Sequence, residues 1–84
     1  MKYGFIAYGK WKPALIGSTE EQARIKKEAE KHGLKVLMWG APYGVSENNV
    51  VVYESEKGIE NYFNFGQAVD LPYTDTRTTI VALP

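Results

Sequence analysis

The sequence contains no cysteine and only one histidine among its 84 residues. Without thiols, no disulfide can brace the fold and no cysteine can serve as a nucleophile. The usual zinc ligand sets are reduced to one imidazole plus carboxylates. We therefore predict neither a bound metal nor a cofactor.

The sequence also lacks an excess of charge of either sign, because ten Lys and Arg residues balance ten Asp and Glu residues. Nucleic-acid binding draws on a positive field that this composition does not supply, so we expect no nucleic-acid partner. The first residues, MKYGFIAYGKWKP, have an apolar run too short to span a bilayer, and they lack the small-residue cleavage site of a signal peptide. We therefore expect no membrane partner and a cytoplasmic location.

Four segments have the composition of β-strands, with β-branched and aromatic residues between turn signals. The predicted strands cover residues 3–8, 34–39, 49–53 and 76–83. Residues 9–13, 40–48 and 67–75 are predicted to be turns or irregular segments.

Two segments are predicted to be helical. Ser18 and Glu21 have the spacing of a capping box and Gly33 is a typical helix stop, so the first helix is expected over residues 19–32. Ile59, Tyr62, Phe63 and Gly66 recur at i, i+3, i+4 and i+7, which predicts a short amphipathic helix over residues 57–66.

The order of these elements, β-α-β-β-α-β, is that of the ferredoxin-like split unit. It predicts one α+β domain over residues 1–84, with a four-stranded antiparallel sheet and both helices on one face.

Several strands are apolar on both sides, although the helices can cover only one face of such a sheet. Strand 3–8 places Phe5 on one side and Ile6 on the other, and strand 34–39 sets Leu34, Val36 and Met38 against Leu37 and Trp39. An apolar face left in water costs free energy and invites aggregation. We therefore predict a homodimer formed through the open face of the sheet.

Three stretches resemble the dimeric α/β-barrel superfamily, and within it the GYD-domain group, with the EthD-like, stress-responsive and antibiotic-biosynthesis-monooxygenase groups as relatives. They are residues 32–37 (HGLKVL), 49–55 (NVVVYES) and 76–84 (TRTTIVALP). The resemblance implies two sheets that pair into a barrel, with a pocket between helices and sheet in each subunit. In this superfamily such pockets host diverse reactions, including cofactor-free oxygenation and isomerisation.

His32 is the one side chain whose unperturbed titration falls near neutrality, and Glu28 lies one helical turn before it. Two interpretations are open. His32 either complements the helix dipole at the end of the first helix, which we favour, or takes part in a ligand site.

Aromatic residues are abundant, and they either fill the core or orient a flat ligand through hydroxyl and indole N–H groups. Trp11, within Lys10–Pro13, is expected in an edge loop that covers the core or the dimer interface. Trp39 and Tyr43 are expected at the dimer interface or at a pocket mouth. The candidate ligand-binding residues are His32, Trp39, Tyr43, Tyr8, Tyr53 and Tyr62.

Two functions are compatible with these patterns. The first is a homodimer that binds or transforms a small apolar or aromatic molecule in a pocket of each subunit. The alternative is a non-catalytic dimerisation or regulatory module with a filled interior. A cavity that touches His32 or a tyrosine hydroxyl would favour the first.

Overall fold

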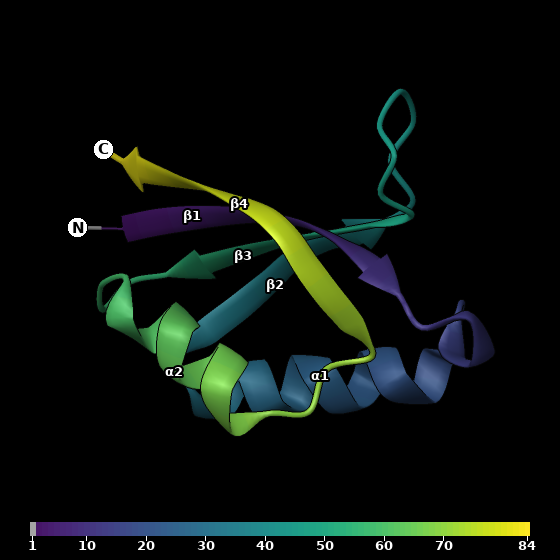
Figure 1. Ribbon diagram of the computed structural model, residues 1–84. Helices are drawn as coiled ribbons and strands as arrows, with labels where there is room; N and C mark the ends of the chain where they lie inside the picture. Colours follow the sequence, from purple (N-terminus) through teal and green to yellow (C-terminus); the bar gives the residue numbers. More distant parts are fainter. Residues whose placement is uncertain (1) are drawn as a thin grey trace.

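The computed structural model describes residues 2–84 as one four-stranded antiparallel sheet covered on one face by two helices (Figure 1). The sheet order is β2-β3-β1-β4, and each pair of neighbours is antiparallel. This α+β arrangement is compatible with the ferredoxin-like fold. The elements, in chain order, are β1 (Lys2–Trp11), a 3-10 turn (Pro13–Leu15), α1 (Thr19–Lys31), β2 (Leu34–Gly40), β3 (Asn49–Ser55), α2 (Glu60–Ala68) and β4 (Tyr73–Leu83).

The predicted serine cap and glycine stop of α1 are confirmed, but the second bond of the capping box does not form, because the Ser18 backbone N–H donates to the Leu15 carbonyl oxygen and the Glu21 carboxylate binds Arg24. The Ser18 hydroxyl accepts a hydrogen bond from the Glu21 backbone N–H at 3.2 Å, which caps the start of the helix. Gly33 follows the helix with φ of +76°, a left-handed conformation that glycine adopts without strain. The helix therefore occupies almost the whole predicted range.

Three predicted boundaries are wrong. Residues 9–11 were expected in a turn but continue β1, because Gly9 to Trp11 pair with Asp75 to Tyr73 of β4. The same pairing makes residues 73–75 the start of β4 rather than an irregular segment. The second helix begins at Glu60 and ends at Ala68, later than predicted at both ends.

The face of the sheet that packs against the helices is called the covered face. Its side chains form rows across the strands, and two of these rows contribute Phe5, Tyr53, Ala7 and Val51 to the core. One row is Val36–Tyr53–Phe5–Ile80 and the next is Trp39–Val51–Ala7–Thr78. Ile25 and Ala29 of α1, with Tyr62 and Phe65 of α2, are buried against them.

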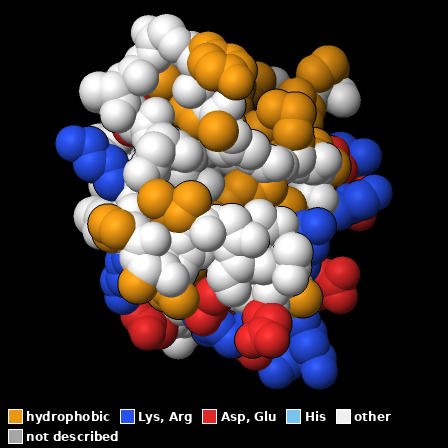
Figure 2. Space-filling view, turned by 90° about the vertical axis from the view of Figure 1, so that its right-hand side faces the viewer, with side chains coloured by type: hydrophobic (Ala, Val, Ile, Leu, Met, Phe, Trp, Pro, Cys, Tyr) orange, Lys and Arg blue, Asp and Glu red, His pale blue; other side chains and the backbone are white. Residues whose placement is uncertain are grey.

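The opposite side of the sheet is called the open face. Its rows are Lys35–Glu54–Gly4–Val81, Met38–Val52–Ile6–Thr79 and Gly40–Val50–Tyr8–Arg77. Met38 is 59% exposed, and Leu37 and Val81 are also exposed. In the side view of Figure 2, charged side chains gather along the bottom, over the helix layer, whereas hydrophobic side chains reach the surface over much of the upper half.

The predicted alternation of β2 is wrong after Val36, because the pairing with β3 shifts between Val36 and Met38. Such a β-bulge adds one residue and re-aims the side chains that follow it. Met38 therefore lies on the open face, and Trp39 packs against the core beside Val36.

The β2–β3 loop, residues 41–48, projects from the sheet on the side away from the helices (Figure 1). Its last residues are firmly held. The Glu47 carboxylate accepts a hydrogen bond from the Thr76 hydroxyl at 2.7 Å and lies 3.3 Å from the Arg77 Nε. The Thr76 bond, with the Arg77 charge, lowers the pKa of Glu47. The loop is thereby tied to β4.

No helix within residues 2–84 combines the length and the apolar composition that a membrane crossing needs.

Candidate functional site

A cavity of about 340 Å³ lies between α2 and β4. Its volume is within the range of small-molecule sites. Buried aromatic rings of Tyr62, Phe65 and Tyr73 form its inner wall, and the exposed side chains of Phe63 and Ile80 stand at its rim. The cavity therefore opens to solvent at this rim.

A polar cluster faces this apolar cavity. The Tyr62 hydroxyl donates a hydrogen bond to Asp75 Oδ2 at 2.9 Å and lies 3.2 Å from Thr78 Oγ1. A phenol hydroxyl has one hydrogen, and Tyr62 uses it in the hydrogen bond to Asp75. The Thr78 hydroxyl therefore acts as the donor to the Tyr62 oxygen. All three side chains line the cavity, so a ligand would meet an oriented chain of hydroxyls ending in a carboxylate.

The pKa values of Asp75 and Tyr62 are both raised in this cluster. Burial raises the pKa of Asp75, although the hydrogen bond from Tyr62 acts in the opposite direction. Burial also raises the pKa of Tyr62 well above its usual range. A carboxyl group with a raised pKa beside a cavity is suited to exchange a proton with a bound molecule.

A second pair of hydroxyls lies deeper on the covered face. The Tyr53 and Tyr73 hydroxyls share a hydrogen bond, and burial raises the pKa of both groups beyond the usual range. Tyr53 stacks edge-on against Phe65, and Tyr73 lines the cavity. These tyrosines remain neutral at physiological pH and act as dipoles rather than as bases.

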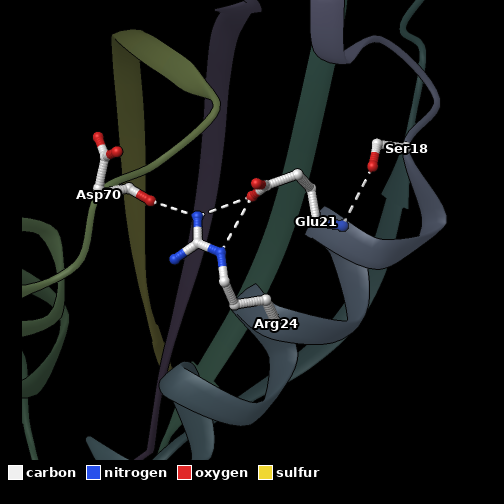
Figure 3. A network of polar contacts seen from close by, with 4 residues as sticks. All are labelled: Ser18, Glu21, Arg24 and Asp70. Carbon is white, nitrogen blue, oxygen red and sulfur yellow. Dashed lines mark hydrogen bonds and ion pairs between the residues drawn. The ribbon is translucent and has the colours of Figure 1, made fainter.

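The segment that joins α2 to β4 closes one side of the cavity, and Arg24 of α1 holds it in place (Figure 3). Arg24 Nη2 donates to the Asp70 carbonyl oxygen at 2.6 Å and to Glu21 Oε2 at 2.7 Å. Leu71, the next residue after Asp70, lines the cavity. Glu21 thus has two roles, since its backbone N–H is also bonded to Ser18 (Figure 3).

Of the sequence-predicted site residues, the structure places Tyr62 on this cavity. Tyr53 is one hydrogen bond away, through Tyr73. Trp39 lines a different cavity, beside the junction of β2 with its loop.

Tyr8 and Tyr43 lie away from both cavities. Tyr8 is on the open face, where the Arg77 guanidinium stacks 4.1 Å from the centre of its ring. Tyr43 is 98% exposed in the β2–β3 loop. Neither side chain therefore lines a cavity between the helices and the sheet.

His32 ends α1 and does not line the cavity between α2 and β4. Its Nδ1 lies 3.0 Å from the Glu28 carbonyl oxygen, and its ring packs edge-on against Phe65. The Glu28 carboxylate instead pairs with Lys31. These contacts match the capping interpretation of His32, and within residues 2–84 no three His, Asp or Glu side chains gather as metal ligands.

Sequence reasoning missed Asp75, Thr78 and Tyr73 as site residues. Asp75 and Tyr73 fell in a segment read as irregular. A signal was present, because residues 73–83 hold six β-branched residues, four of them threonine, and contain no glycine or proline.

No protein-family model matches the chain, and no curated protein is significantly similar to it in sequence.

Proposed function

We propose that the protein binds a small apolar or aromatic molecule in the cavity between α2 and β4, and that it does so as a homodimer of the dimeric α/β-barrel type. The observation that supports binding is the cavity of about 340 Å³, with aromatic walls and the Tyr62–Asp75–Thr78 cluster on one side. Apolar rings would stack on the bound molecule, and the cluster would orient a hydroxyl or carbonyl group on it.

A ligand that binds only the folded protein must raise its melting temperature. We expect 2-naphthol, a flat molecule with one hydroxyl, to raise the melting temperature in a concentration-dependent way. Replacing Gly66, a cavity residue of α2, by leucine should abolish this shift by filling the cavity. A Cβ at that position meets no neighbour within 4 Å, and Gly66 is exposed, so we expect the fold to tolerate the change.

Ala68→Leu is the matched control, because Ala68 is on the same helix, exposed, and outside the cavity lining. This variant should keep the naphthol shift. A shift of equal size in Gly66→Leu would place the ligand elsewhere and contradict the proposal.

The dimer is supported by the apolar row Met38–Val52–Ile6 on the open face. A standard interface buries about 800 Å² per partner, which a four-stranded sheet face can supply. Tyr43, on the loop that projects to the same side, adds an aromatic side chain of the kind enriched in interfaces.

Sedimentation at micromolar concentration tests this assembly. We expect a dimer for the unmodified chain and a monomer for Met38→Glu, which would bury a charge in the interface. Ile59→Glu, at an exposed apolar residue before α2, should remain dimeric. A monomeric unmodified chain would refute the dimer, whereas a dimer without any naphthol response would favour the non-catalytic dimerisation module.

A further inference from the structure

The cavity between α2 and β4 has one charged side chain in its lining, that of Asp75, and within residues 2–84 no Lys, Arg or His lines it. Asp75 is exposed, so a molecule in the cavity can reach it. An ionised carboxylate has about four acceptor sites, and the hydrogen bond from Tyr62 occupies one of them. The carboxylate can therefore accept further hydrogen bonds from a ligand.

The arginines on neighbouring elements do not neutralise this carboxylate. Arg77, two residues along β4, lies on the open face, where its Nε is 3.3 Å from Glu47 Oε2. Arg24, which holds the segment between α2 and β4, pairs with Glu21 on α1 (Figure 3). Among the described residues, no ion pair joins Asp75 to a cation. The cavity therefore presents a negative charge that the chain leaves uncompensated.

Apolar side chains that a ligand can reach lie at the rim of the same cavity. Phe63 and Ile80 are 50% and 41% exposed there. Tyr62 connects the charged and the apolar surface, because its hydroxyl bonds Asp75 at 2.9 Å and its ring centre lies 5.7 Å from that of Phe63. A single tyrosine side chain therefore separates the carboxylate from the Phe63 ring.

We propose, as a refinement that rests on the function proposed above, that the ligand of this cavity is a cationic amine, with an ammonium group on a short arm of a single aromatic ring. The ammonium donates to the Asp75 carboxylate, and the ring packs against Phe63 and Ile80.

The charge of the ligand follows from the charge of Asp75. Hydrogen bonds that involve ionised groups are roughly twice as strong as neutral ones, so an ammonium is preferred over a hydroxyl at this place. A cation there also favours the charged form of the carboxyl, against the burial that raises its pKa. A ligand carboxylate would instead be repelled.

Three probes of similar shape test this charge preference. At neutral pH, phenethylamine is a cation, 2-phenylethanol is neutral and phenylacetate is an anion. Their dissociation constants are measured by titration of the ¹⁵N-labelled full chain, followed at the backbone amide signals of Gly66 and Asp75. We expect phenethylamine to bind about tenfold more tightly than 2-phenylethanol, and phenylacetate to bind most weakly. Equal binding of the amine and the alcohol, or a preference for phenylacetate, would overturn the proposal.

Two variants test whether Asp75 is the source of the preference. Asp75→Asn removes the charge and keeps an acceptor for Tyr62, so the preference for the amine over the alcohol should disappear. Asp70→Asn is the matched control, because Asp70 is exposed, carries the same charge and lies outside the cavity lining. This control should keep the preference. If both variants lose it equally, the amine responds to the net charge of the chain, and the proposal fails.

Gly66→Leu and 2-naphthol separate this inference from the proposed function. Gly66→Leu, which fills the cavity, should abolish amine binding, and binding that survives would place the amine elsewhere and refute the inference. If 2-naphthol raises the melting temperature but the amine is not preferred over the alcohol, the ligand is neutral, so the inference is overturned and the proposed function stands. If neither 2-naphthol nor the amine binds, the proposed function fails and this inference fails with it.

Discussion

The two faces of the sheet differ in how deeply their apolar side chains are buried. On the covered face, Phe5 and Tyr53 are fully buried by the helices. On the open face, their strand neighbours Ile6 and Val52 are only half-buried, although they are equally apolar. At these central positions the side chains are apolar on both faces, and what differs is the layer that covers them.

The largest effect should come from Phe5, which stacks on Tyr62 with ring centres 4.5 Å apart. Phe5→Ala should lower the free energy of unfolding by about 3–5 kcal/mol, because it removes a buried ring and leaves a cavity. Ile6→Ala, at the next residue on the open face, should cost about 1–2 kcal/mol in dilute solution, since less apolar area is lost. Urea denaturation measures both, and equal losses would contradict the contrast between the faces.

Gly33 lies where the end of α1 meets Asn61 of α2, and its replacement should have the next largest effect on stability. Gly33→Ala forces alanine to a positive φ and brings its Cβ within 2.6 Å of Asn61 Nδ2, which donates to the His32 carbonyl oxygen. We expect a loss of about 2 kcal/mol, half from the backbone and half from this contact.

Gly44→Ala is the control for Gly33, because Gly44 has φ of +80° and open space around it. Gly44→Ala should lower the free energy of unfolding only through the strain of the positive φ, by about 1 kcal/mol. Thermal unfolding of the two variants gives the difference. If they are equally destabilised, the Asn61 contact does not stabilise the helix layer.

Arg24 joins the two parts of the covering layer, so its removal should loosen that layer without disturbing the open face. Arg24→Ala should lower the free energy of unfolding by about 1 kcal/mol through loss of the bond to the Asp70 carbonyl. Glu21→Gln keeps that bond and should cost less. Hydrogen exchange should show faster opening of residues 69–72 in Arg24→Ala alone, and unchanged exchange would show that the segment is held by packing.

Asp75 places a carboxylate at the edge of the covered face and should give the smallest effect, with a defined pH dependence. Its pKa is raised in the folded state, so the folded protein holds this proton more tightly than the unfolded chain. The stability contributed by the protonated carboxyl is present in acid and is lost as pH rises through the raised pKa. Asp75→Asn keeps an acceptor for Tyr62 without the charge.

We therefore expect Asp75→Asn to raise the free energy of unfolding at pH 7 by less than about 1 kcal/mol, and to have no effect below about pH 3. Melting curves across this pH range measure it. A destabilised variant at pH 7 would mean that Tyr62 requires the charged carboxylate.

The sequence predicted the elements and their order because the relevant signals are local. Ser18, Glu21 and Gly33 determine where α1 starts and stops through contacts within a few residues. The bulge after Val36 and the continuation of β1 through Trp11 depend on pairing with distant strands, so no local pattern revealed them. The candidate site was predictable only in part for the same reason, since Tyr62 meets Asp75 and Thr78 across two elements.

The pairing of β1 with β4 also has a consequence for the rate of folding. Lys2 lies opposite Leu83, so these strands join nearly the two ends of the described chain, whereas β2 and β3 are consecutive. Long-range pairing requires a large loop to close before any contact compensates for the lost entropy. We expect the β2–β3 hairpin to form early and β4 to dock late, which would complete both the Tyr62–Asp75 bond and the cavity in the last step.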